Sequence, residues 1–291
     1  MDDSRLEAHD LGFQDYSRAE TLIDLGRYDQ ALTQIAQQLT RDPEDPTGHF
    51  LVGVVHLHKS QYDEAISACH RSLGSEPGFA PAYHLLSFAW HGKYHFDNEL
   101  KCAEEAVRLE PDDPQYLHRL AEAQQQSGQI AKALVSAREA TRLDPESAHG
   151  HALLAELALE YKQKADAEKH YRAALELEPE NEAYLHNLAR VLTARGKHLQ
   201  AIELMFDAAR VDPSNALIRD NLYSTVHDWL GRNIVRFRYA KAKTELPPAL
   251  VTFYEQERSK AGFFKRHYAI TFVGLSLGAL VLITGMFSTL I

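Results

Sequence analysis

The chain has 291 residues, a length that is enough for one large or two small folded domains. Of these residues, 45% are hydrophobic and 25% are charged. Its net charge of −10 argues against nucleic acid as a partner. The two cysteines, Cys69 and Cys102, form no CxxC motif and predict no disulfide framework, which favours a reducing, cytosolic environment.

The N-terminal segment, residues 1–11, is acidic and contains no apolar run. It therefore lacks the features of a secretory signal peptide, and no glycine follows the methionine to accept a myristoyl group.

Residues 12–215 repeat with a period of 34 residues. An acidic residue followed by proline recurs six times at that interval: Asp42-Pro43, Glu76-Pro77, Glu110-Pro111, Asp144-Pro145, Glu178-Pro179 and Asp212-Pro213. Because proline cannot continue a helix, each pair predicts the end of one helix and the turn to the next.

Small residues keep the same period, as expected where two helices approach closely. They occur at Ala19, Gly53, Ser87, Ala121, Ala155 and Ala189 in the first helix of each unit, and at Ala31, Ala65, Ala133, Ala167 and Ala201 in the second. Gly26, Gly128 and Gly196 mark the turn between the two helices. Each unit is therefore a helix–turn–helix that must stack on a neighbour to bury its apolar face.

This pattern resembles the tetratricopeptide repeat (TPR) family, over residues 12–215 and as about six units. The resemblance implies an all-α TPR solenoid. The third unit departs from the pattern, since Tyr94 replaces the turn glycine and Glu99 replaces the packed alanine. We expect looser packing or an altered turn near residues 91–95.

In this family the first helices line a concave groove that binds peptides. Carried onto this chain, the groove is apolar in units two and three and polar in units four to six. The apolar part holds Phe50, Leu51, Val54, Leu57, Leu85 and Phe88, with His84 beside them. The polar part holds His118, Arg119, Glu122, Gln125, Glu156, His186, Asn187 and Arg190. Such a surface suits a protein or peptide with an uneven face; the alternative is that the chain's own N-terminus, with Leu6 and Leu11, fills it.

Some relatives bind the C-terminal carboxylate of heat-shock chaperones through lysine and asparagine residues in the groove. Here the places that carry the lysine hold Tyr16, Phe50, His84, His118, Ala152 and His186, which speaks against that clamp. Histidines and Arg119 remain available for acidic ligands.

After the repeats we expect a capping helix over residues 216–243 and a basic juxtamembrane segment over 244–267. Between Arg232 and Arg266 there are nine basic and three acidic residues, a net charge of +6, which leaves −16 for the residues before Arg232. Basic residues beside a membrane helix favour the cytoplasmic side and can bind acidic lipid head groups; an ordinary solvated basic helix is the alternative.

Residues 268–291 contain no Asp, Glu, Lys or Arg and thirteen Leu, Ile, Val, Phe or Met residues. A helix of this length spans about 36 Å, enough to cross a bilayer core of about 30 Å. We predict a single-pass, tail-anchored protein with its bulk in the cytosol, most simply at a bacterial inner membrane, with a eukaryotic organelle membrane as the alternative. Gly274, Gly278 and Gly285 share one face of this helix and could pack against another membrane helix.

No catalytic motif is present, and the pairs His56/His58 and His149/His151 point to different sides of a helix, so we predict neither an enzyme, a metal site nor a cofactor. The sequence predicts a membrane-tethered scaffold or adaptor that binds a cytosolic partner through the groove. The alternatives are a receptor for chaperone-bound clients in protein import or secretion, and a structural subunit of a membrane complex.

Overall fold

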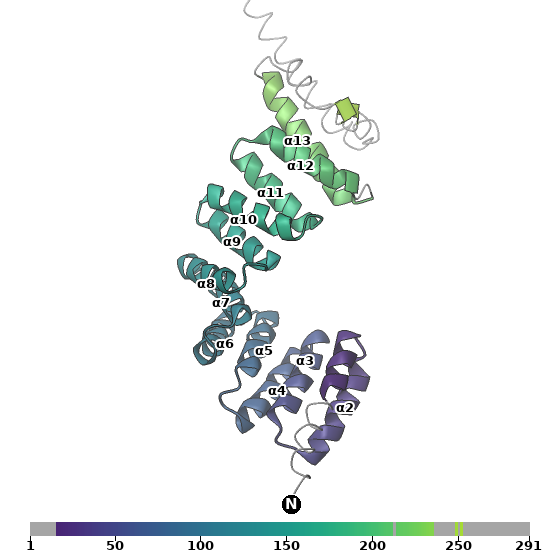
Figure 1. The fold of residues 1–291 in the computed structure, drawn as a ribbon, viewed down its shortest axis with the longest axis vertical. Helices are drawn as coiled ribbons and strands as arrows, with labels where there is room; N and C mark the ends of the chain where they lie inside the picture. Colours follow the sequence, from purple (N-terminus) through teal and green to yellow (C-terminus); the bar gives the residue numbers. More distant parts are fainter. Residues whose placement is uncertain (1–15, 212–213, 236–247, 250, 253–291) are drawn as a thin grey trace, which may run out of the picture. The chain divides into compact units, whose positions relative to one another are not determined.

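The structure is a computed structural model that describes residues 16–211, 214–235, 248–249 and 251–252. These residues are helical over 16–24 and then form twelve longer helices (Figure 1). The helices are α2 (Tyr28–Arg41), α3 (Pro46–His58), α4 (Tyr62–Ser75), α5 (Ala80–Gly92), α6 (Phe96–Leu109), α7 (Pro114–Gln126), α8 (Ile130–Leu143), α9 (Ala148–Glu160), α10 (Lys164–Leu177), α11 (Glu182–Ala194), α12 (His198–Val211) and α13 (Ala216–Val235).

The predicted all-α solenoid of helix pairs is confirmed. Helices α3 and α4, α5 and α6, α7 and α8, α9 and α10 pack as antiparallel pairs, and each second helix also contacts the next first helix up to α9. The chain divides into two compact units, residues 1–179 and 180–291. In the second unit, α11 packs on α12 and α12 on α13.

In the five Asp-Pro or Glu-Pro pairs that the structure describes, the acidic residue ends a second helix, as predicted. The backbone N–H of Asp42 bonds to the carbonyl of Gln38, and the same bond recurs at Glu76, Glu110, Asp144 and Glu178. Polar side chains then cap several of the following first helices. Asp45 and Asp113, for example, accept hydrogen bonds from backbone N–H groups of α3 and α7, which satisfies donors that have no partner within the helix.

The turn within each pair has the same backbone geometry whether or not it holds glycine. Gly26, Gly128 and Gly196 have φ angles of +68°, +72° and +78°. Tyr94 occupies the equivalent place with φ +60°, as do Ser60 and Lys162 at +57° and +63°. The predicted alteration of the turn at residues 91–95 is therefore wrong, because the packing of the two helices imposes the left-handed conformation on a tyrosine as well.

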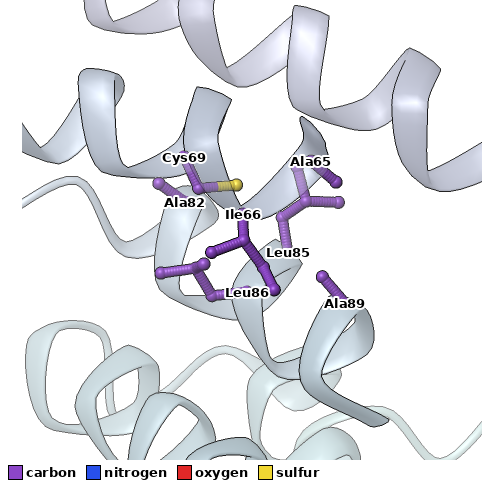
Figure 2. Close-up of a cluster of buried hydrophobic side chains, with 7 residues drawn as sticks. All are labelled: Ala65, Ile66, Cys69, Ala82, Leu85, Leu86 and Ala89. Atoms are coloured by element: carbon purple, nitrogen blue, oxygen red, sulfur yellow. The ribbon is translucent and has the colours of Figure 1, made fainter. Parts of the chain in front are cut away.

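Alanine fills the contacts between helices, as predicted. In the first unit Ala19, Ala121 and Ala155 in first helices, and Ala65 and Ala133 in second helices, are fully buried. Figure 2 shows one such cluster, in which Ala65, Ile66 and Cys69 of α4 meet Ala82, Leu85, Leu86 and Ala89 of α5. Small residues let the helix backbones approach closely while leucine and isoleucine supply most of the buried apolar area.

Within residues 216–243, which are predicted to form a capping helix, the structure describes α13 (Ala216–Val235), where Leu222 and Val226 are fully buried. Residues 236–247 of the predicted capping helix and juxtamembrane segment, and most of residues 248–267, lie outside the described residues. The predicted anchor, residues 268–291, also lies outside them. In the part of the chain that the structure describes, no helix is long and apolar enough to span a bilayer.

Candidate functional site

Successive first helices contact one another in the first unit: α3 packs against α5, α5 against α7, and α7 against α9. Residues 34 positions apart therefore form columns that cross these helices on one side. One column consists of Glu20, Val54, Phe88, Glu122 and Glu156, and every member is at least partly exposed. We call this surface the first-helix face and define it by Phe50, Val54, Leu57, His84, Phe88, Glu122, Gln125 and Glu156.

The apolar part of the first-helix face lies on α3 and α5. Phe50, Val54 and Leu57 are partly buried, and all three pack against the cluster shown in Figure 2. Phe88 is the more open residue, with 37% of its surface exposed. The other large apolar side chains of α5 are buried or partly buried, and this makes Phe88 the centre of the candidate site.

Two predicted groove residues lie in the core instead. Leu51 is 4% exposed and packs with Ala31, Ile35 and Val55, and Leu85 is 7% exposed in the α4–α5 cluster. Successive residues on a helix point about 100° apart, so the neighbours of Phe50 and His84 turn inwards. Leu51 and Leu85 stabilise the repeats and do not contribute surface.

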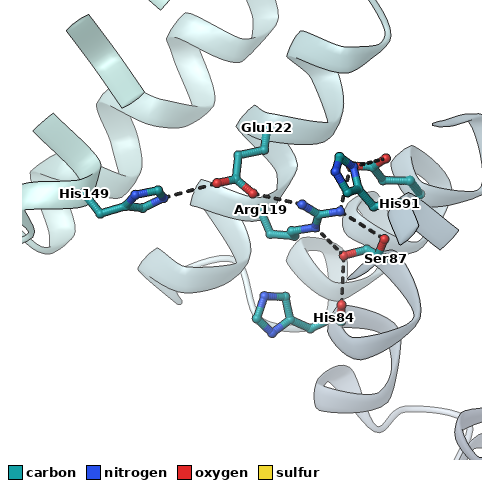
Figure 3. A network of polar contacts seen from close by, with 7 residues as sticks. His84, Ser87, His91, Arg119, Glu122 and His149 are labelled. Carbon is teal, nitrogen blue, oxygen red and sulfur yellow. Dashed lines mark hydrogen bonds and ion pairs between the residues drawn. The ribbon is translucent and has the colours of Figure 1, made fainter. Parts of the chain in front are cut away.

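Arg119 is also buried, with 4% of its surface exposed, and all three of its side-chain nitrogens donate hydrogen bonds within the chain. Nε donates to the Ser87 hydroxyl at 2.8 Å, and one terminal nitrogen donates to the Ser87 carbonyl at 3.0 Å and to Glu99 at 2.7 Å. The other donates to Glu122 at 2.9 Å. Figure 3 shows the guanidinium of Arg119 between Ser87 and Glu122. Arg119 is therefore not open to an acidic ligand.

Glu99 explains why the third unit does not pack loosely. Its side chain is fully buried on α6, where one carboxylate oxygen accepts the hydrogen bond from Arg119 and the other lies 3.0 Å from Nδ1 of His91. A buried carboxylate with two such partners is satisfied, whereas an unpaired one would be costly. The expectation of looser packing at Glu99 is wrong for this reason.

Glu122 extends the polar contacts to the fifth unit. Its second oxygen lies 3.2 Å from Nε2 of His149 on α9, a contact drawn in Figure 3. Burial would raise the pKa of Glu122, but the hydrogen bonds from His149 and Arg119 and the charge of Arg119 outweigh burial and lower it. The bond to Glu122 raises the pKa of His149. Polar contacts thus run from α6 through α7 to α9.

Burial lowers the pKa of two further histidines on first helices. Burial, followed by the charge of Arg119, lowers the pKa of His84 to about 4, and its ring lies 5.0 Å from the Phe88 ring and 4.8 Å from the Tyr116 ring. Burial and the neighbouring His149 lower the pKa of His118. His118 is 9% exposed and its Nε2 faces Gly150, so it contributes little to the surface.

The remaining predicted residues fall elsewhere. Asn187 and Arg190 lie on α11 in the second unit, where Arg190 donates a hydrogen bond to Asn187 at 3.2 Å. His186, on the same helix, is bonded to Asn221 of α13 at 3.0 Å. Gly274, Gly278 and Gly285 lie outside the described residues.

The other paired histidines have structural contacts. His56 bonds to Gln61 and His58 stacks on Tyr28, while His151 lies against His170 and the carbonyl of Pro145. Over the described residues, no group of three or more His, Cys, Asp or Glu side chains is arranged to hold a metal ion.

The sequence model of one family, described as tetratricopeptide repeat, matches residues 16–78 and 118–177. Over these two stretches the chain carries tetratricopeptide repeats. The matched stretches leave out residues 79–117, which include Tyr94 and Glu99. A search of curated protein sequences gave no match.

Several solved structures share the fold, and two of those described below are named as TPR proteins. A thermophilic TPR protein of Thermus thermophilus, TTC0263, is 24% identical with a TM-score of 0.52, covering 62% of this chain and 98% of that one. Pseudomonas aeruginosa pilF is 17% identical with a TM-score of 0.64, covering 74% and 97%. YrrB, described as a TPR protein with an unusual peptide-binding site, is 15% identical with a TM-score of 0.53, covering 63% and 95%. At these identities the likeness concerns the fold.

Proposed function

We propose that this chain is a non-enzymatic scaffold or adaptor that binds a protein or peptide partner on the first-helix face. The observation that carries the proposal is Phe88, a large apolar side chain 37% exposed on the first-helix face, beside the partly buried Phe50, Val54 and Leu57. An exposed aromatic residue beside further apolar side chains is the usual anchor point of a peptide or helix. The peptide-binding site named for YrrB gives this use of the fold a precedent.

We further propose that residues 268–291 hold this face at a membrane and that the basic residues of 232–266 lie against acidic lipid head groups. The support is the uncharged sequence of residues 268–291 and the net charge of +6 before it. Tethering raises the local concentration of the partner beside other membrane proteins, so a modest affinity is sufficient.

The contacts of Arg119 argue against the chaperone-receptor alternative. It depends on Arg119 meeting an acidic tail, and each side-chain nitrogen of Arg119 already donates a hydrogen bond to Ser87, Glu99 or Glu122. The structural-subunit alternative depends on Gly274 and Gly278, and it predicts that replacing both by leucine dissociates a complex while changes on the first-helix face have little effect.

Photocrosslinking tests the binding proposal. A photoreactive amino acid replaces Phe88 in the full chain, and the adducts formed in living cells are identified by mass spectrometry. The control places the same amino acid at Val135, which is 66% exposed on the second helix α8. We expect one dominant protein adduct from position 88, and we expect that position 135 does not give this adduct. An adduct only with residues 1–11 would mean that the chain covers its own face and would overturn the proposal.

The anchor is tested separately. Deleting residues 264–291 should move the protein from the membrane to the soluble fraction after cell lysis, and the full chain should resist extraction by high salt. A deleted chain that still sediments with membranes would refute the assignment of residues 268–291 as the anchor.

A further inference from the structure

Glu99 and Arg119 occupy places that hold alanine and leucine in other units. In three other units, the residues at the places equivalent to Glu99 and Arg119 also pack together. Each of these residues lies a multiple of 34 positions away, so the two members of a pair are again 20 residues apart. These apolar pairs are Ala31 with Leu51, Ala65 with Leu85, and Ala133 with Leu153, and each pair lies within one core cluster. At the equivalent place between α6 and α7, an ion pair stands where these three units hold an apolar pair.

The exchange alters what lies under the first-helix face. In units two and three, Val54 packs against the cluster that contains Leu85. The equivalent of Val54 in the next unit is Phe88, and beneath it lies the guanidinium of Arg119, with Cζ 4.2 Å from the ring centroid. A planar cation at this distance attracts the face of an aromatic ring.

The guanidinium that lies against the Phe88 ring is held by its own hydrogen bonds. Arg119 is held by Ser87, Glu99 and Glu122, and the edge-to-face contact with His84 holds the ring from another side. Because Glu99 is fully buried and holds the guanidinium of Arg119, the guanidinium cannot move out towards a bound ligand. The Phe88 ring is thus held on the surface with 37% of the residue exposed. A leucine at position 119 would provide no planar charged group for the ring to pack against.

We propose that Arg119, held in place by Glu99, is a positioning residue that keeps the Phe88 ring on the first-helix face and sets what this ring accepts. The guanidinium already lies against the ring, so a partner meets only its exposed apolar surface, and this surface takes an uncharged apolar or aromatic side chain of a protein partner. This inference rests on the proposed function and adds the chemistry of the group that Phe88 contacts.

The test restores the residues of the neighbouring units. The double variant Glu99→Ala with Arg119→Leu recreates the pair found at Ala65 and Leu85, so the core remains apolar and filled. A photoreactive amino acid at Val54, beside Phe88 on the same face, reports partner binding in cells from the full chain. We expect adduct formation to fall about five- to thirty-fold in the double variant while its thermal unfolding stays close to that of the parent.

Two comparisons separate a positioning role from a merely structural one. Removing the exposed ion pair of α8 by Glu139→Ala with Arg142→Ala should leave the adduct unchanged. Arg119→Lys keeps the charge but loses the planar guanidinium, so it should also lower the adduct. This variant keeps the test decisive if the double variant does not fold.

The outcomes are distinct. An adduct from the parent chain that persists at full yield in both the double variant and Arg119→Lys would overturn the positioning role and leave the proposed function standing. If the parent gives no adduct from either position 54 or position 88, the proposed function fails and the positioning role fails with it. Loss of the adduct in the folded double variant, with retention in the α8 control, supports the inference.

Discussion

Breaking the Glu99–Arg119 pair from one side should be far more harmful than removing it from both. Arg119→Leu leaves Glu99 fully buried with His91 as its remaining partner, and Glu99→Ala leaves Arg119, 4% exposed, with Glu122 and Ser87. A buried charge that loses its partner costs about 3–5 kcal/mol, whereas exchanging a buried ion pair for a well-packed apolar pair is often neutral or stabilising. We therefore expect about 3–5 kcal/mol of destabilisation for Arg119→Leu, about 3 for Glu99→Ala, and a change within about 1 kcal/mol for the double variant.

Thermal unfolding of the full chain in detergent, followed by circular dichroism, measures the cycle. At roughly 2–4 °C per kcal/mol for a domain of this size, each single variant should lower the midpoint by roughly 6–20 °C. Hydrogen exchange at α6 and α7 locates the loss, because units of a repeat protein can unfold separately. The reasoning is refuted if the double variant loses as much stability as the two single variants added together, since that would mean the two charges are not coupled.

Three further changes test other parts of the structure. Gly150→Ala places a Cβ 2.6 Å from Nε2 of His118 and should destabilise the α7–α9 contact by about 1–3 kcal/mol in chemical denaturation; an unchanged midpoint would mean that His118 moves aside freely. Lys162→Gly should stabilise the chain by about 0.5–1 kcal/mol, because φ +63° is unfavourable for any residue with a Cβ, and a loss of stability would contradict this. The pKa of His84 lies near 4, below its ordinary value of 6.5, so as the pH falls the unfolded chain binds this proton before the folded chain does. The stability that depends on neutral His84 is therefore complete above pH 6.5 and is lost as the pH falls towards 4, by up to about 3 kcal/mol. His84→Phe, which copies Phe50 of the preceding unit, should flatten the stability profile between pH 6.5 and 4; an equally steep profile would assign the acid sensitivity to other groups.

The fold could be predicted from the sequence because its signals are periodic and local. Proline after an acidic residue ends each second helix through backbone chemistry alone, and alanines such as Ala65 and Ala133 mark close helix contacts at a fixed interval. Ser60 and Lys162 gave no such signal, because the left-handed turn there is imposed by the packing of two helices and does not depend on the residue.

The candidate site was predicted only in part. Phe50, Val54, Leu57, Phe88 and Glu122 lie on the first-helix face, and these follow from helical spacing. The error at Arg119 and Glu99 came from judging each residue alone: one was interpreted as a ligand contact, the other as a packing defect. Their separation of 20 residues, the same as in Ala65 and Leu85, is the signal that pairs them. A buried ion pair is a property of two positions in different units, and it appears in the sequence only when the repeats are aligned.

The buried pair also bears on how the chain assembles. Repeats of similar sequence can dock in the wrong order or exchange between molecules while they fold, because one apolar interface resembles the next. The interface between α6 and α7 is different: any other docking would separate Glu99 from Arg119 and take from each buried charge its oppositely charged partner across this interface. A shift of the array by one repeat is therefore penalised at this junction, so this pair of charges favours the native docking of α7 on α6.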